Sequence, residues 1–106
     1  MTEQHPLREL ALPLLGKWAV AIILALAEGD KHFALLEREI GQVSRKVLNQ
    51  NLKALIEINL VEKIGQASQG DKVFYRLTPL GKEFLPLLLQ IKQWIKDHEE
   101  ELKPKK

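Results

Sequence analysis

The stretch FALLEREIGQVSRKVLNQNLKALI, residues 33 to 56, decides the fold of this chain. Apolar residues recur every three or four positions on both sides of Gly41, which predicts a short amphipathic helix, a turn and a second, longer helix. Ser44 is a good N-cap for the second helix, because its hydroxyl can accept a hydrogen bond from a free backbone N–H of the first turn. The stretch therefore predicts a helix-turn-helix unit.

The second helix has two faces of different chemistry. At about 100° per residue, the apolar and polar side chains fall on opposite sides, with Arg45 at the edge between them. The apolar side contains Leu48, Leu52, Leu55 and Ile56, and the polar side contains Lys46, Asn49, Gln50, Lys53 and Glu57. Cationic and amide side chains can hydrogen-bond to phosphates and base edges. The pattern suits a recognition helix, although a merely solvated helix has a similar outer face.

Length and composition favour one ordinary globular domain spanning residues 1–106. Of the 106 residues, 45% are hydrophobic and 28% are charged, which allows a modest core that would gain from a partner subunit. The absence of cysteine excludes disulfides, thiolate metal ligands and a thiol switch. We see no secretion signal, and the longest apolar run, residues 18–27, is shorter than the roughly 20 residues of a membrane span. We expect a cytoplasmic protein without a membrane partner.

Positive charge is concentrated on the segment that contains the candidate recognition helix. Residues 44–76 contain six basic and three acidic side chains, a local net charge of +3 in a chain whose total is +2. A surface that binds a polyanion requires such an excess. A solvated basic pair of strands would have the same composition.

Two helices are predicted before the helix-turn-helix. The first, at residues 5–15, has an apolar stripe, and the second, at residues 17–28, contains WAVAIILALA and has no polar face. A helix that is apolar all round must be surrounded by protein, so we expect the second helix at the centre of the core. Gly29 ends it.

Two short strands are predicted after the helix-turn-helix. Asn59 is expected in a left-handed turn, and residues 60–65 and 72–77 are expected to be extended, with the polar loop QASQGD between them. In the second strand, Val73, Tyr75 and Leu77 alternate with polar or outward residues. A hairpin in this place forms a wing, residues 60–77.

The last helix is predicted at residues 79–102, because Thr78 can cap it and Pro79 suits its first position. We expect Pro86 to bend this helix rather than end it. Its apolar residues cover more than one face, which a small domain cannot bury alone. We therefore expect a homodimer formed by the first and last helices, with interface residues Leu7, Leu10, Leu14, Leu88, Ile91, Trp94 and Ile95.

The chain resembles HxlR-type winged helix-turn-helix transcriptional regulators, which are related to the MarR group, over nearly its whole length. The matching stretches are GKW at 16–18, HF at 32–33, VSRKVLNQNLKAL at 43–55, VFYRLTPLG at 73–81, and LPLL with the later Trp94. The resemblance implies a mainly α fold with a small β-hairpin that dimerises through its N- and C-terminal helices. It also implies a homodimeric DNA-binding protein that represses or activates adjacent genes.

The resemblance and the face of the second helix together give the expected contacts with double-stranded DNA. Asn49 and Arg45 are expected to read bases, whereas Lys53 and the lysines outside the helix are expected to contact phosphates. The full set of expected DNA-binding residues is Ser44, Arg45, Lys46, Asn49, Gln50, Lys53, Lys72, Lys17 and Lys31. On a two-fold dimer the operator should be an inverted repeat with half-sites about 34 Å apart.

Three positions depart from the family's pattern. A Cys-Pro pair is replaced by His5-Pro6, so thiol sensing of the kind found in some relatives cannot operate. The basic residue before the phenylalanine is His32, which weakens an expected phosphate contact at neutral pH. The Pro-Pro pair before the second strand is Gly70-Asp71, which makes the wing less positive.

Two other classes of function compete with DNA binding. An enzyme is disfavoured, because the three histidines are scattered and no nucleophile lies near a base in a recognisable pattern; we expect no catalytic residue, metal or cofactor. A winged-helix protein-interaction module without DNA binding is the stronger alternative. The surplus apolar surface suggests the hypothesis that a pocket between the terminal helices and the core could hold a small apolar effector. The operator sequence, the regulated genes, the direction of regulation and the identity of the effector stay open.

Overall fold

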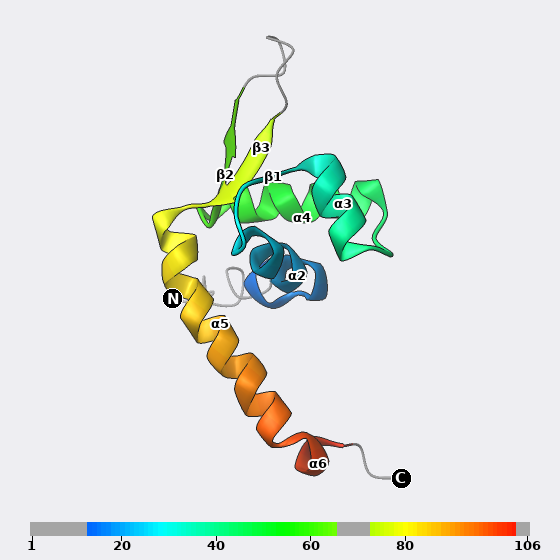
Figure 1. Ribbon diagram of the computed structural model, residues 1–106, viewed down its shortest axis with the longest axis vertical. Coiled ribbons are helices and arrows are strands. Elements are labelled where there is room, and N and C mark those ends of the chain that lie inside the picture. Colours follow the sequence, from blue (N-terminus) through cyan, green and yellow to red (C-terminus); the bar gives the residue numbers. More distant parts are fainter. Residues whose placement is uncertain (1–12, 66–72, 104–106) are drawn as a thin grey trace, which may run out of the picture.

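Helix α2 (Lys17–Leu26) lies at the centre of the computed structural model, which describes residues 13–65 and 73–103 (Figure 1). It contacts helices α3, α4 and α5 and strand β3, as its apolar sequence predicts. Ala19, Ile22, Ile23 and Leu26 are buried, while its remaining apolar side chains are only partly covered. The helix ends earlier than predicted, and Gly29 then adopts a φ of 143°, a conformation that favours glycine.

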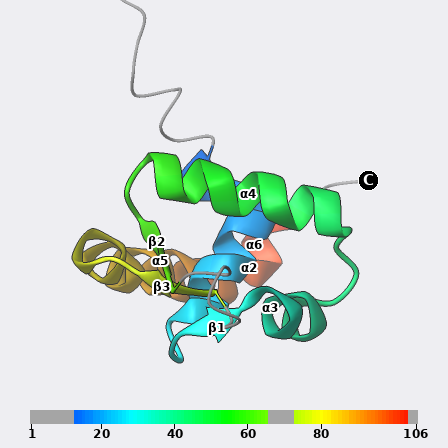
Figure 2. The ribbon, with the colours of Figure 1, turned by 90° about the horizontal axis from the view of Figure 1, so that it is seen from above.

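The helix-turn-helix consists of α3 (Phe33–Ile40) and α4 (Arg45–Glu57). Ser44 caps α4 as predicted, because its hydroxyl accepts a hydrogen bond from the Val47 N–H at 3.1 Å. The turn places both Gly41 and Gln42 at positive φ, 69° and 41°, so it requires more than the one glycine that the sequence indicated. Figure 2 shows α4 lying along one side of the structure, with its first turn next to the end of α3.

Packing of one face fixes the orientation of α4. Its inner residues Leu48, Leu52 and Leu55 are each 1% exposed or less, as the predicted apolar side requires. Burying a leucine side chain contributes about 2 kcal/mol, so this seam outweighs any exposed contact of the same helix. The opposite face is therefore held toward solvent.

The wing is a pair of antiparallel strands, β2 (Val61–Ile64) and β3 (Phe74–Leu77). Asn59 precedes β2 at a φ of 67°, as predicted for a left-handed turn. The predicted loop at residues 66–71, together with Lys72, lies outside the described residues. The fold class is confirmed as a mainly α winged helix-turn-helix with a small β-hairpin.

The sheet has one more strand than the sequence predicted. Strand β1 (Lys31–His32) pairs antiparallel with β3, so the strand order is β1-β3-β2. Lys31 lies opposite Tyr75, which ties the start of the helix-turn-helix to the wing. A strand of two residues leaves no alternating pattern in a sequence, because alternation needs about four residues.

Helix α5 (Pro79–Asp97) begins as predicted, with the Thr78 hydroxyl accepting from the Gly81 N–H at 3.0 Å, and it continues through Pro86. It ends at Asp97, and a short helix α6 (Glu99–Leu102) follows, so the prediction of one helix at residues 79–102 was wrong. The backbone leaves the helical conformation at His98, with φ −115° and ψ 23°.

Three glutamates follow the break. Glu99, Glu100 and Glu101 form the first turn of α6, where carboxylates are favoured. His98 covers the end of α5, because its ring stacks on Trp94 at 4.4 Å and its backbone N–H donates to the carbonyl oxygen of that residue at 3.1 Å. The last turn of α5 is thus closed by an ordinary helical hydrogen bond from His98.

Helix α5 is joined to the end of α4 by a compact junction. The Thr78 hydroxyl donates to the Asn59 carbonyl oxygen at 2.7 Å, and the Thr78 backbone N–H donates to the Leu60 carbonyl oxygen at 3.0 Å. Gly81 is buried against the same Leu60 carbonyl group. The start of α5 therefore has little freedom to move relative to α4 and the wing.

We predict that Gly81→Ala destabilises the protein by about 2 kcal/mol, as other overpacked sites do. A Cβ at this position would overlap the Leu60 carbonyl oxygen, and this strain should outweigh the roughly 1 kcal/mol that alanine gains over glycine in a helix. Urea unfolding would measure the difference. Lys82→Ala, at the exposed neighbouring position, is the control, and equal stability of the two variants would contradict the prediction.

Candidate nucleic-acid interface

The outward face of α4 presents the side chains that the sequence assigned to DNA binding. Asn49, Lys46, Gln50 and Lys53 fall within an arc of about 100° around the helix axis, with Arg45 beside it. All the expected α4 residues are exposed: Ser44, Arg45, Lys46, Asn49, Gln50 and Lys53. The hydroxyl of Ser44 is already used as the helix cap. The face combines cations with amides and is open to a large partner.

A shallow hollow lies at the first turn of α4. It is lined by Arg45, Lys46 and Asn49 from α4 and by Phe33 from α3. The structure therefore brings together three residues that the sequence proposed as DNA contacts, and it adds an aromatic ring beside them. The ring offers apolar contact to a partner, and the amide and cationic side chains beside it offer hydrogen-bond donors.

Arg45 contacts α3 in two ways. Its Nε lies 3.8 Å from a carboxylate oxygen of Glu37, and the centre of its guanidinium lies 5.4 Å from the Phe33 ring centre. The sequence gave no sign of either contact, because the partners come from the other helix of the unit. The spacing of Phe33 and Glu37, four residues apart on α3, indicates that they share a face but not that Arg45 lies against it.

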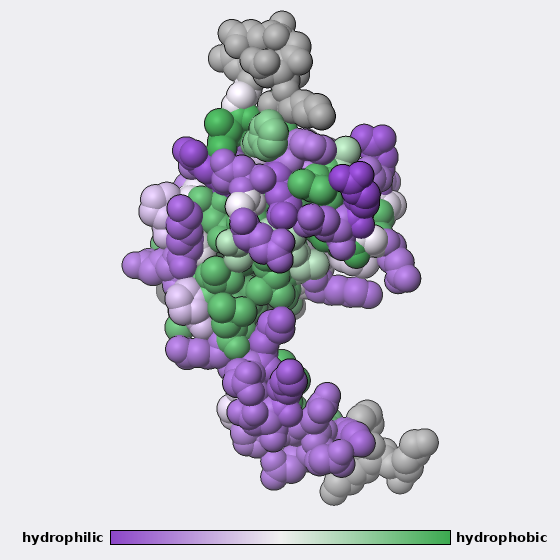
Figure 3. All heavy atoms as spheres, in the orientation of Figure 1, coloured by the Kyte–Doolittle hydropathy of each residue, from purple (hydrophilic) through white to green (hydrophobic). Residues whose placement is uncertain are grey.

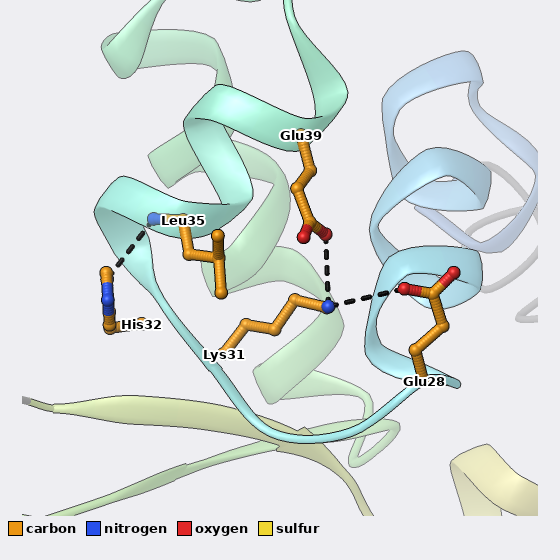
Figure 4. A network of polar contacts seen from close by, with 5 residues as sticks. All are labelled: Glu28, Lys31, His32, Leu35 and Glu39. Atoms are coloured by element: carbon orange, nitrogen blue, oxygen red, sulfur yellow. Dashed lines mark hydrogen bonds and ion pairs between the residues drawn. The ribbon is translucent and has the colours of Figure 1, made fainter.

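Lys31 is not available for a phosphate contact, so that assignment was wrong. It is 7% exposed, and its Nζ lies 3.0 Å from Glu39 and 3.4 Å from Glu28 (Figure 4). The hydrogen bond to Glu39 is the main cause that raises the pKa of Lys31 above its usual value. The two ion pairs join α3 to the segment that follows α2.

His32 and Lys17 have contacts of their own. The Nδ1 atom of His32 accepts from the Leu35 N–H at 3.2 Å, so this side chain caps α3 and its ring is held in place (Figure 4). Lys17 is exposed, and its ammonium lies 4.6 Å from the Trp18 ring centre. A phosphate contact by Lys17 stays a prediction, and Lys72 lies outside the described residues.

A stripe of exposed apolar residues runs along α5. Leu87, Ile91, Trp94 and Ile95 fall within an arc of about 100° and are each at least 44% exposed. Leu88 is 2% exposed in the chain's own core, so it is not available to a partner, contrary to the expected interface. Leu7 and Leu10 lie outside the described residues. Figure 3 shows apolar side chains gathered where α5 meets the body of the protein.

An apolar groove of about 310 Å³ lies between α5 and the junction of α4 with β2. Leu14, from the helical residues 13–15, forms part of it, so the Leu14 side chain lines this groove. The other lining residues are Ile58, Leu60, Leu80, Glu83, Phe84 and Leu87. This is the region where the sequence placed a small apolar effector, and that effector stays a prediction.

The described residues contain neither a membrane-spanning helix nor a cluster of metal ligands. Across residues 13–65 and 73–103, no helix is long and apolar enough to cross a membrane. In the same ranges no group of three or more His, Asp or Glu side chains is placed to hold a metal ion.

A family model, a curated relative and two solved structures match most of the chain. Residues 14–103 match the family model described as HxlR-like helix-turn-helix. The HTH-type transcriptional regulator YtfH of Escherichia coli is 38% identical over 93 residues, which cover 88% of this chain and 74% of that protein. The solved structure of the putative transcriptional regulator ytfH from Salmonella typhimurium is 32% identical with a TM-score of 0.82, and the match covers 95% of this chain and 90% of that one. Diamide-treated YodB from Bacillus subtilis is 28% identical with a TM-score of 0.75, and the match covers 91% and 96%.

We predict that Lys31→Ala lowers the midpoint of thermal unfolding, because it leaves Glu28 and Glu39 without their shared cation and opens a gap beneath α3. Lys46→Ala removes the same charge from an exposed position and should leave the midpoint nearly unchanged. Calorimetry of the two variants checks this. A midpoint for Lys31→Ala as high as that of Lys46→Ala would show that the buried lysine is not structural.

Proposed function

The chain belongs to the HxlR-like helix-turn-helix family and is a DNA-binding transcriptional regulator, and we propose that it acts as a homodimer that reads an inverted-repeat operator through α4. The observation that supports this proposal is the hollow at the first turn of α4, where Arg45, Lys46 and Asn49 converge in solvent. In helix-turn-helix proteins this part of the second helix contacts base edges in the major groove.

We assign base reading to Asn49 and Arg45. The amide of Asn49 can donate to N7 and accept from N6 of adenine, and the guanidinium of Arg45 can donate two hydrogen bonds to guanine. Lys46 lies beside them on the rim of the hollow and suits either guanine or a phosphate. Each good pair of this kind discriminates against a wrong base by about 1–3 kcal/mol.

We assign phosphate contacts to Lys53, to Lys17 and, on the wing, to Lys72. Such contacts fix the register of the protein on DNA without reading sequence. Arg76 is a poorer candidate, because its Nε is paired with Glu62 at 2.6 Å across the wing. Each phosphate neutralised should add about 0.9 to the negative slope of log affinity against log salt concentration.

The apolar stripe of α5 supports the homodimer. A contiguous set of exposed leucine, isoleucine and tryptophan side chains is unfavourable in water, and a second copy of the same helix covers it with matching chemistry. The interface we propose consists of Ile91, Trp94 and Ile95 with the N-terminal residues Leu7, Leu10 and Leu14. A two-fold axis between the α5 helices would place two α4 helices on half-sites about 34 Å apart.

The proposal also covers the cellular location, the absence of catalysis and the alternative function. We propose that the protein acts in the cytoplasm, because its relatives are bacterial and the DNA of bacteria lies there. We propose no catalytic role, since the family and the named relatives are regulators of transcription. The alternative of an interaction module without DNA binding predicts that the α4 face can be changed without effect on DNA affinity.

We predict that the triple variant Arg45→Ala, Lys46→Ala, Asn49→Ala loses operator affinity by at least about 30-fold, which corresponds to two lost base contacts of about 1 kcal/mol each. Fluorescence anisotropy would measure it, with a duplex that the wild-type protein selects from a randomised pool. Lys96→Ala, an exposed lysine on α5, is the control and should bind normally. Full operator affinity in the triple variant would contradict the assignment of base reading to α4 and would favour the interaction module.

We predict that the double variant Ile91→Glu, Trp94→Glu is monomeric at concentrations where the wild type is dimeric, because two carboxylates cannot be buried against a like surface. Analytical ultracentrifugation measures the mass. The matched control is Leu89→Glu, which changes an apolar residue of similar exposure, 46%, about 160° around the helix from Ile91. A monomeric wild-type protein, or an unchanged dimer in the double variant, would refute the proposed interface.

A further inference from the structure

We propose that Glu37 determines specificity: its carboxylate, on α3, biases Arg45 toward a base edge and against a backbone phosphate. This inference rests on the DNA-binding role proposed for α4. It adds to that role an acidic residue on the neighbouring helix, which would repel DNA if overall charge alone governed binding.

The first step is the placement of the Arg45 side chain. Phe33 and Glu37 lie one turn apart on α3, and both contact the guanidinium of Arg45, the ring at 5.4 Å and the carboxylate at 3.8 Å. The Arg45 side chain is nevertheless 75% exposed. It therefore lies against α3 without being enclosed, and its remaining surface faces the hollow that Lys46 and Asn49 share.

The second step is the direction of the free donors. Glu37 approaches Arg45 at Nε, whereas the two terminal NH₂ groups of a guanidinium make the bidentate pair with N7 and O6 of guanine. The contact with Glu37 thus leaves the base-reading donors available. At 3.8 Å it is longer than a hydrogen bond, and an exposed ion pair of this length adds little to stability. Fold stability alone does not explain why a carboxylate lies here.

The third step is electrostatic. A phosphate that approached Arg45 would place its negative charge near the carboxylate of Glu37, whereas a base edge is neutral. Two like charges about 5 Å apart repel by close to 1 kcal/mol even in water, which is about a threefold or larger change in affinity. Among the described residues, Glu37 is the one carboxylate within ion-pairing distance of Arg45. The first turn of α4 contains no acidic residue of its own. The penalty on phosphates at this site therefore comes from Glu37.

The test measures two affinities for each variant at one salt concentration. One duplex is selected by the wild-type protein from a randomised pool, and the other is a scrambled duplex of the same length and composition. Glu37→Gln should raise affinity for the scrambled duplex by about threefold or more and change operator affinity less, so that their ratio falls. Glu57→Gln removes the same charge from an exposed position at the far end of α4 and should leave the ratio unchanged.

A double-mutant cycle tests whether Glu37 acts through Arg45. In an Arg45→Ala background, Glu37→Gln should no longer alter the ratio, because the side chain that it biases is absent. The inference is overturned if Glu37→Gln leaves the ratio unchanged, if it lowers both affinities equally as a purely structural residue would, or if its effect persists without Arg45. Failure of the wild-type protein to prefer any duplex would instead overturn the proposed function, and the inference with it.

Discussion

Burial of α2 is the constraint on which the rest of this structure depends. A ten-residue helix with no polar face is unstable at an exposed surface, and helices α3, α4 and α5 and strand β3 all pack against it. Helix α4 meets α2 through Leu48, Leu52 and Leu55, which are almost fully buried. Burial of these three leucines stabilises the fold by several kcal/mol, at about 2 kcal/mol per leucine, whereas the Ser44 cap stabilises it by about 1 kcal/mol. Packing thus decides which face of α4 points outward, and the cap decides where α4 begins.

The elements that the sequence predicted well are those with local signals. Ser44, Asn59 and the pair Thr78-Pro79 each determine the backbone within a few residues, and the structure has the corresponding cap, left-handed turn and helix start. The elements that were missed depend on partners distant in the sequence. Strand β1 exists because β3 pairs with it, and the buried Lys31 of that strand is paired with Glu39, near the end of α3. A lysine in the sequence gives no sign of whether such a partner is near.

In the candidate site, too, the features with local signals were predicted and those that depend on tertiary contacts were not. Periodicity alone placed Lys46, Asn49, Gln50 and Lys53 on the outer face of α4, and each of these side chains is exposed. Periodicity could not show that Arg45 lies against Glu37 and Phe33, because that contact depends on the angle between two helices and on a turn with two residues at positive φ. The net charge of the segment was therefore a poor guide to which cations are free. Within residues 44–76, Arg76 is paired with Glu62, whereas Lys46 and Lys53 are not paired with any described carboxylate.

The junction at Thr78 connects the proposed interface to the proposed reading surface. Thr78 bonds to both Asn59 and Leu60, at the end of α4, and Gly81 allows α5 to approach the same backbone closely. Helix α5 therefore leaves the body of the protein at a fixed angle to α4. In a dimer held by α5, the separation of the two α4 helices would follow from this angle and from where the α5 helices cross. The apolar groove lies beside the junction and is lined by Leu60, Leu80 and Phe84 among others. Over the length of α5, about 28 Å for 19 residues, this fixed angle determines where the far end of the helix lies, and with it the spacing at which a two-fold dimer would present its two α4 helices to half-sites one helical turn of DNA apart.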